Sequence, residues 1–326
     1  MRRGLLEWVQ ANSHDLIDCA RCDVDIEVYA SIARAKSNIY LCRLSCSHAT
    51  VECCVKEFTK SSASDIERLA ERGYLLQPHI ARQGVAVPVF RKHDADLRVI
   101  AMTFMHGEPL EGRIVGSFFR GGEARIDCCE IVRRLGGQLA GIHRVDAVAT
   151  LAFARSCRNE EYVRRIAAPL SDPFVFGCLS SGKSTPKSIV EALPESFWTR
   201  HEKRFLHGDF QAKNVLVGDE QKLEMIDLSY GHGHPLFDVA QFLVQLVRLH
   251  RRWNFARAAR LIREYGDVFL DSYFSGDRLY LREDLPFFLL WANAYSLQAD
   301  RNHARPVRMY ISCHLRRTGF TERWSS

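Results

Sequence analysis

The sequence has 326 residues, of which 47% are hydrophobic and 26% are charged, and its formal net charge is +6. This composition excludes a disordered or fibrous chain, and the length allows two lobes with a sizeable core. Eleven cysteines without an apolar N-terminal signal segment favour a reducing compartment, and no apolar run has the length of a membrane span. We therefore expect a soluble, cytoplasmic protein.

The first third of the chain predicts a small antiparallel sheet. Three β-prone runs, at 25–29, 39–44 and 50–58, are separated by polar turns. Lys56 stands late in the third run, where an apolar strand makes a lysine costly unless its ammonium has a partner. The ammonium therefore either reaches phosphate oxygens or, on an alternating edge strand, points to solvent.

A helix is expected next, from residue 63 to about residue 81, with Ser64 as its N-cap. Its apolar residues recur at helical spacing, namely Ile66, Leu69, Leu76 and Ile80. Glu67 and Glu71 lie on the same helix, and either carboxylate can orient Lys56 or remain on the surface.

Two further elements precede the middle of the chain. The apolar run 99–105, which includes Phe104, predicts a buried strand that ends at Gly107. A helix is expected over 126–145, where Leu135, Leu139 and Ile142 recur.

Residues 177–184 satisfy the P-loop pattern G-x-x-x-x-G-K-[ST]. However, the preceding apolar run is short, and Pro186 stands where the phosphate-binding helix should already propagate. The segment also lacks the preceding strand and helix alternation of an α/β sheet. We interpret it as an exposed loop, so that Lys183 has no nucleotide role.

The cysteines allow a zinc site or ordinary buried thiols. Cys19 and Cys22 have the spacing of metal ligands, whereas Cys42 and Cys46 are slightly too far apart for a zinc ribbon. Cys42 and Cys46 also alternate along one strand face, as small buried residues do. We favour the second interpretation.

The most informative stretch is 205–217 followed by 223–228. Short apolar runs predict strands that hold Asp209, Asn214 and Asp227 in a rigid frame. Phosphoryl transfer requires a carboxylate beside the attacking hydroxyl and oxygen ligands for magnesium. Asp209 can supply the first, and Asn214 and Asp227 can supply the second. The alternative is a strand-turn-strand in which these polar side chains only stabilise a tight turn.

The order of His207, Asp209, Asn214 and Asp227 follows the catalytic loop of kinases, with Gly208 in place of the usual Arg. Residues 226–228 replace D-F-G, and residues 233–240 read G-x-P-x-x-D-[LV]-A. With these motifs the sequence resembles the aminoglycoside phosphotransferase and choline kinase-like family of small-molecule kinases. The resemblance runs from about residue 26 to about residue 246.

The resemblance implies an α+β, protein-kinase-like bilobal fold. Residues 1–105 would form an N-lobe with an N-terminal helix and a small antiparallel sheet, and residues 106–326 a mainly helical C-lobe. It also implies ATP and Mg²⁺ as cofactors, with Asp209 as the catalytic base and Asn214 and Asp227 as metal ligands.

In the N-lobe the resemblance implies that Lys56 clamps the phosphates with Glu71, preferred over Glu67, behind it. The loop 33–38 lacks G-x-G-x-x-G, but Ser37 and Asn38 match a Ser-Asn that the family often has there. Phe104 falls in the hinge whose backbone meets adenine.

In the C-lobe, the helix that ends at 141–146 resembles the family's L-x-x-L-H-x-[VD]-D helix. Asp238 is expected to brace the catalytic loop through hydrogen bonds to its backbone, and His207 to pack beneath that loop.

We therefore expect an enzyme that transfers the γ-phosphoryl group of ATP to a hydroxyl of a small molecule. Arginines crowd residues 248–263 and 301–317, which indicates either a solvated helix face or a positive acceptor pocket. A positive pocket favours a neutral or anionic sugar-type acceptor over a polycationic aminoglycoside. The alternatives are an aminoglycoside phosphotransferase and a non-catalytic kinase-like nucleotide-binding protein. An RNA-binding protein is favoured by charge alone, and we expect no nucleic-acid partner.

Overall fold

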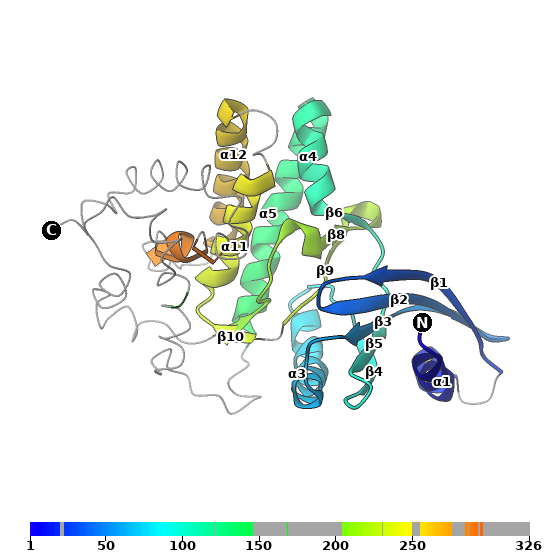
Figure 1. Ribbon diagram of the computed structural model, residues 1–326. Coiled ribbons are helices and arrows are strands. Elements are labelled where there is room, and N and C mark those ends of the chain that lie inside the picture. The colour runs from blue at the N-terminus through cyan, green and yellow to red at the C-terminus, as the bar shows by residue number, and fades with distance from the viewer. Residues whose placement is uncertain are drawn as a thin grey trace. The chain divides into compact units, whose positions relative to one another are not determined.

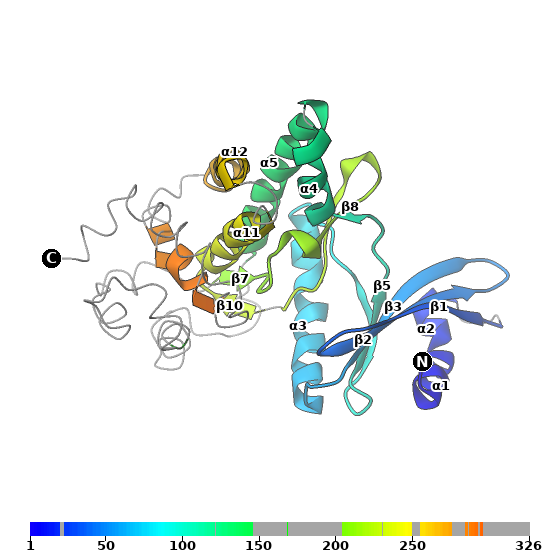
Figure 2. The same cartoon turned by 45° about the horizontal axis from the view of Figure 1, so that its top comes forward.

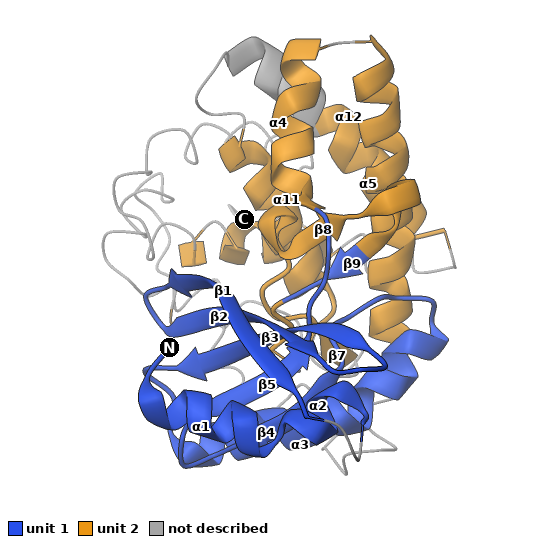
Figure 3. Ribbon diagram, turned by 90° about the vertical axis from the view of Figure 1, so that its right-hand side faces the viewer, with its two compact units in different colours: residues 1–107, 224–226 blue, residues 108–223, 227–326 orange. Residues whose placement is uncertain are grey.

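The computed structural model describes residues 1–19, 23–120, 122–145, 168, 204–229, 231–249, 255–275, 284–285, 287–292 and 294–295. The chain divides into two compact units, residues 1–107 with 224–226 and residues 108–223 with 227–326 (Figure 3). The return of 224–226 to the first unit was not expected from the sequence. It arises because the Met225 N–H donates to the Ala86 carbonyl oxygen at 2.9 Å, beside a parallel bridge between Ala86 and Glu224.

The first unit is built on a five-stranded sheet with the order β1-β2-β3-β5-β4, in which all neighbouring strands are antiparallel (Figure 1). Its strands are β1 (Asp25–Ala33), β2 (Ser37–Ser45), β3 (Thr50–Phe58), β4 (Phe90–Asp94) and β5 (Val99–Thr103). The three β-prone runs of the sequence therefore form the expected meander. Lys56 lies on β3, which has a neighbour on each side, so the edge-strand interpretation of Lys56 is wrong.

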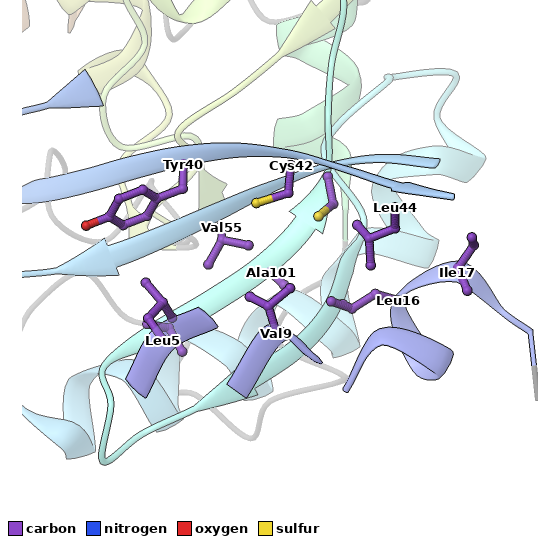
Figure 4. Packing of buried hydrophobic residues seen from close by; sticks show 11 residues of the cluster. Leu5, Val9, Leu16, Ile17, Tyr40, Cys42, Leu44, Val55 and Ala101 are labelled. Carbon is purple, nitrogen blue, oxygen red and sulfur yellow. The ribbon is translucent and has the colours of Figure 1, made fainter. Parts of the chain in front are cut away.

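Two N-terminal helices, α1 (Arg3–Ala11) and α2 (Ser13–Ile17), cover one face of this sheet (Figure 4). Their apolar side chains pack against alternate strand residues in a shared core, which includes Leu5, Val9, Leu16, Tyr40, Cys42, Leu44, Val55 and Ala101. Because side chains alternate along a strand, the burial of Val55 on this face places Lys56 on the opposite face.

The helix α3 (Ala63–Arg82) lies along β4 and β5 (Figure 2). Its expected position is confirmed, but its N-cap is Ser62 and not Ser64. The Ser62 hydroxyl accepts a hydrogen bond from the Asp65 N–H, and the Asp65 carboxylate accepts one from the Ser62 N–H. This reciprocal pair is a capping box, whose spacing fits Ser62 with Asp65.

The second unit is mainly helical, with α4 (Leu110–Arg120), α5 (Gly122–Arg144), α11 (Leu236–Leu249) and α12 (Phe255–Tyr273). The long helix α5 packs against both α4 and α12 (Figure 2). A Cβ atom on Gly136 of α5 would lie 2.4 Å from the Phe269 carbonyl oxygen, so the close approach of α5 and α12 requires a glycine here.

Short elements surround the helices of the second unit. They are β6 (Glu108–Pro109), β7 (Arg204–Leu206), η1 (Ala212–Asn214), β8 (Val215–Val217), η2 (Asp219–Gln221), β9 (Leu223–Met225, which enters the first unit at Glu224) and β10 (Gly231–Gly233). The strand β7 pairs with β10, and β6 pairs with β8, both antiparallel.

The expected fold class, an α+β protein with an antiparallel-sheet N-terminal part and a mainly helical C-terminal part, is confirmed. None of the helices that the structure describes has the length and apolar character needed to cross a membrane. The P-loop-like residues 177–184 lie outside the described residues.

Candidate active site

The loop between β7 and β8 contains His207, Gly208 and Asp209, and Gly208 fixes how closely the following chain can approach it. Gly208 has φ +85°, and a Cβ atom at this position would lie 1.8 Å from Ser229 Oγ. Ser229 in turn donates from its N–H and its hydroxyl to the His207 carbonyl oxygen, at 2.8 and 3.0 Å. The segment that carries Asp227 is therefore held beside the loop that carries Asp209.

Three hydrogen bonds fix Asp209 within its own loop, and two of them reach its carboxylate. Asn214 Nδ2 donates to the Asp209 carbonyl oxygen at 2.8 Å and to Asp209 Oδ2 at 3.0 Å, and Gln211 Nε2 donates to Oδ1. Asn214 is buried, whereas Asp209 is only half-buried. Because Asn214 uses its amide nitrogen on Asp209, its amide oxygen is left to act as a ligand.

Asp238 holds the backbone of the same loop, as expected from the sequence. It lies in the first turn of α11, is fully buried, and accepts hydrogen bonds from the His207 N–H at 2.7 Å and the Gly208 N–H at 2.9 Å. His207 is also fully buried, with its ring edge-on to Phe210, which confirms that it packs under the loop.

His143 completes this arrangement, although no separate role was predicted for it. Its Nε2 lies 3.1 Å from Asp238 Oδ2, and its Nδ1 lies 2.8 Å from the Tyr273 hydroxyl. The only signal in the sequence was its place in the helix motif at 141–146. A buried carboxylate is tolerated when hydrogen bonds replace its lost hydration, and Asp238 has them from two backbone amides and an imidazole.

Asp227 has the left-handed backbone conformation, with φ +60°, and its side chain is exposed. Such a conformation is uncommon outside glycine, and among other residues Asp and Asn adopt it most readily. Non-glycine residues in this region concentrate at functional sites. Asp227 therefore combines an accessible carboxylate with a backbone that only a few residue types tolerate.

In the first unit, the strand register places Ile39, Lys56 and Ile100 on one face of the sheet. Lys56 is half-buried, and its ammonium lies 5.2 Å from the centre of the Phe58 ring. Ser37 is buried on this same face because it pairs with Phe58.

Asn38 is oriented differently from Ser37. Its side chain lies on the opposite face of the sheet, and its Nδ2 donates to Glu57 Oε2 at 3.0 Å. Successive residues of a strand point to opposite faces, so Ser37 and Asn38 cannot both face the side of Lys56. Any contact of Asn38 with phosphate on that side would therefore come from its backbone.

The expected pairing of Glu71 with Lys56 stays a prediction. Glu71 is exposed, and Glu67 instead lies 3.2 Å from Nε2 of His93, a residue of β4. The packing of α3 on β4 thus gives Glu67 a different partner and leaves Glu71 in solvent.

Phe104 is held to β3 through its backbone N–H, which donates to the Glu52 carbonyl oxygen at 3.2 Å. His106 packs edge-on against the Phe104 ring, and its Nε2 lies 3.2 Å from Glu52 Oε2. The N–H of Phe104 is thus used within the first unit, and the contact of the hinge backbone with adenine stays a prediction.

The remaining expectations concern cysteines and arginines. Cys42 and Cys53 are buried free thiols at paired strand positions, as expected of small core residues, whereas Cys22 lies outside the described residues. In the described part of the chain, no group of three or more His, Cys, Asp or Glu side chains could hold a metal ion. Of the late arginines, Arg260 and Arg263 are exposed on α12, and residues 301–317 lie outside the described ones.

A small antiparallel sheet that carries a lysine, followed by a mainly helical unit with a braced Asp-Asn loop, is the combination expected of a kinase-like phosphotransferase. The comparison with family models agrees, since residues 52–282, more than half of the chain, match the phosphotransferase enzyme family (APH). The chain belongs to this family. No curated protein matches it by sequence.

Solved structures show the same fold. The chain is similar to an aminoglycoside-3'-phosphotransferase of type VIII, with 20% identity, TM-score 0.51, and coverage of 84% of this chain and 94% of that chain. It is similar to choline kinase from Cryptosporidium parvum, with 13% identity, TM-score 0.53, and coverage of 91% and 89%. It is also similar to an amicoumacin kinase in complex with AMP-PNP, Ca²⁺ and Ami, with 12% identity, TM-score 0.55, and coverage of 98% and 96%.

Proposed function

We propose that the protein transfers the γ-phosphoryl group of ATP to a hydroxyl group of a small molecule, with Mg²⁺ as the metal. The observation that carries the proposal is the Asp209 carboxylate, oriented by Asn214 and Gln211 in a loop whose backbone Asp238 holds. The family membership supports phosphoryl transfer, and the nucleotide analogue in the amicoumacin kinase structure supports ATP.

Asp209 is the proposed base. It would accept the proton of the acceptor hydroxyl as that oxygen bonds to the γ-phosphorus and the bond to the β,γ-bridging oxygen of ATP breaks. The hydrogen bonds from Asn214 and Gln211 keep the carboxylate in one orientation, which limits the reorganisation needed at each turnover. Lys56, on the face of the first unit's sheet opposite the N-terminal helices, is the proposed partner of the phosphates.

The residues present fit a magnesium ion. The exposed Asp227 carboxylate and the Asn214 amide oxygen are hard oxygen ligands, and Mg²⁺ is commonly held by one or two carboxylates with the remaining positions filled by water and phosphate. A bound Mg²⁺ would neutralise charge on the phosphate oxygens. Asp227 and Asn214 would hold it, while Asp209 stays available for the hydroxyl.

The proposed acceptor is a neutral or anionic sugar-type molecule. The support is electrostatic: the net charge is +6, and arginines gather in the late part of the chain. Of these, Arg260 and Arg263 are exposed on α12. Several like charges around one site repel a polycation and attract an anion.

The test is an ATP-consumption assay of the purified chain against sugars, sugar phosphates, amino alcohols and aminoglycosides, with mass spectrometry of each product. We expect acceptor-dependent ADP formation, and a loss of roughly 10²- to 10⁴-fold in kcat for Asp209→Asn. Nucleotide binding without turnover of any acceptor would indicate a non-catalytic binding protein. A kcat/KM for an aminoglycoside above that for every sugar would overturn the proposed acceptor class.

A further inference from the structure

The side chain of Glu57 is a buried carboxylate on the face of the sheet opposite to that of Lys56. Its side chain is 5% exposed and lies on the face that the N-terminal helices cover. Tyr40, whose ring lies on the same face (Figure 4), donates its hydroxyl to Glu57 Oε2 at 3.2 Å, and Asn38 Nδ2 donates to the same oxygen at 3.0 Å. The Arg2 guanidinium forms an ion pair with Oε1.

The three partners of Glu57 are not equivalent. Tyr40 and Asn38 are neutral donors, and among the described residues only Arg2 brings a positive charge to this carboxylate. A buried carboxylate that loses its cation keeps its desolvation cost, so removing one partner of such a pair is far more disruptive than removing an exposed pair. Arg2 immediately precedes α1, whose first turn bonds to the Arg2 carbonyl oxygen.

Asn38 links Glu57 to the turn that connects β1 and β2. It stands directly opposite Glu57 in the strand register, and its side chain is held on the core face. The turn itself closes through the Arg34 N–H, which donates to the Ser37 carbonyl oxygen at 2.8 Å. The Lys36 carbonyl oxygen accepts a hydrogen bond from the Thr59 N–H at 3.0 Å. Holding the Asn38 side chain on the core face therefore fixes the turn next to it and keeps Ser37 on the face of Lys56.

We propose that Arg2 and Glu57 are positioning residues for the phosphate groups of the nucleotide. Their ion pair sets the side-chain position of Asn38, and through it the conformation of the turn 34–37, whose backbone N–H groups and Ser37 meet the phosphates. This role rests on the proposed use of ATP.

The test compares Arg2→Ala with Arg3→Ala. Arg3, the neighbouring residue and the first of α1, is a matched control because both side chains of its ion pair with Glu7 are exposed. For each purified variant we would measure the melting temperature, the dissociation constant of AMP-PNP with Mg²⁺, the KM for ATP, the KM for the acceptor, and kcat. We expect Arg2→Ala to raise the KM for ATP and the AMP-PNP dissociation constant by about tenfold. The acceptor KM should stay constant, and Arg3→Ala should match the wild type.

Conservative variants distinguish an effect on nucleotide positioning from a loss of the folded structure. Arg2→Lys keeps a cation and should recover part of the ATP affinity. Tyr40→Phe removes one neutral hydrogen bond from Glu57 and should raise the KM for ATP by less than about tenfold. This variant tests the role even if Arg2→Ala fails to fold. The double variant Arg2→Ala with Glu57→Gln should change the logarithm of the KM for ATP by less than the sum of the changes in the two single variants, because both substitutions act on one interaction.

The outcomes separate this proposal from the proposed function. A wild-type protein that binds neither ATP nor AMP-PNP overturns both. A wild-type protein that binds nucleotide, with a KM for ATP unchanged in Arg2→Ala and Tyr40→Phe whatever their melting temperatures, overturns the positioning role alone.

Discussion

The imidazole of His143 lies 3.1 Å from the carboxylate of Asp238, and both side chains are fully buried. Asp238 also accepts the backbone N–H groups of His207 and Gly208. The pair therefore ties the end of α5 and the start of α11 to the loop that carries Asp209. The geometry of the candidate base depends on a buried network that does not itself contact Asp209.

The variant Asp238→Asn tests this dependence. An asparagine has one oxygen where Asp238 has two, so either the His207 or the Gly208 N–H loses its acceptor and faces an amide NH₂ group. Leaving a buried donor unsatisfied costs about 1–3 kcal/mol, so we expect a lower free energy of unfolding and a lower kcat. Urea unfolding and ATP-consumption kinetics measure the two quantities. The exposed Asp219→Asn serves as the control, and equal behaviour of the two variants would contradict the bracing role.

Gly208→Ala should damage the loop through sterics. The added Cβ would overlap Ser229 Oγ, and the positive φ costs a non-glycine residue about 1–2 kcal/mol. We expect a reduced melting temperature and a reduced kcat. Adding Ser229→Gly should remove the overlap and restore part of the melting temperature and part of kcat. The recovery should be incomplete because the cost of the positive φ persists.

Gly112→Ala is the matched control for Gly208→Ala. Gly112 lies within α4 with nothing inside 4 Å of its Cβ position, so alanine there should stabilise the helix by about 1 kcal/mol or less. Unchanged stability and activity in Gly208→Ala would show that Ser229 can shift to make room for the added methyl group without disturbing the loop.

The sequence predicted what depends on local spacing. Asp209, Asn214 and Asp227 stand in short segments beside apolar runs, and the strands β7, β8 and β9 follow from that pattern. The role of Asp238 was predicted because the resemblance reached its motif.

What the sequence did not predict depends on contacts between distant strands and helices. The bond between Asn38 and Glu57 requires the register of β2 and β3, and the pairing of Glu67 with His93 requires the packing of α3 on β4. Neither register nor packing is encoded in the spacing around one residue. The same limit explains why residues 224–226 were not assigned to the first unit.

Cys128 gives a pH-dependent prediction. Burial in α5 raises the pKa of its thiol to about 11, so the folded protein holds a proton there that an unfolded chain releases at a lower pH. Stability from this group is therefore complete below about pH 8 and falls as the pH rises toward 11. We expect the free energy of unfolding to decline over this range more steeply in the wild type than in Cys128→Ser, whose hydroxyl does not titrate there. Parallel curves would show that Cys128 is accessible to water.

Asp227→Asn tests the proposed magnesium ligand. Asn tolerates a positive φ as readily as Asp, so the backbone should keep its conformation and the effect should come from the lost charge. We expect an unchanged melting temperature without metal and a loss of turnover on the order of 100-fold. A titration of activity with Mg²⁺ should show a weaker apparent affinity in the variant. Wild-type turnover with wild-type magnesium dependence would exclude Asp227 from the metal site.

The lysines Lys56 and Lys183 distinguish two possible nucleotide sites. Lys56 lies on a central strand with its side chain half-buried, whereas Lys183 belongs to the P-loop-like segment outside the described residues. A cation fixed on a rigid strand stabilises the phosphates at little cost in reorganisation. Lys56→Ala should therefore raise the KM for ATP or lower kcat by on the order of 100-fold. Lys183→Ala and the exposed control Lys60→Ala should leave both near wild type. The comparison is valid only if all three variants have the wild-type melting temperature. If Lys183→Ala abolished turnover and Lys56→Ala did not, residues 177–184 would bind the nucleotide, and the assignment of Lys56 would be wrong.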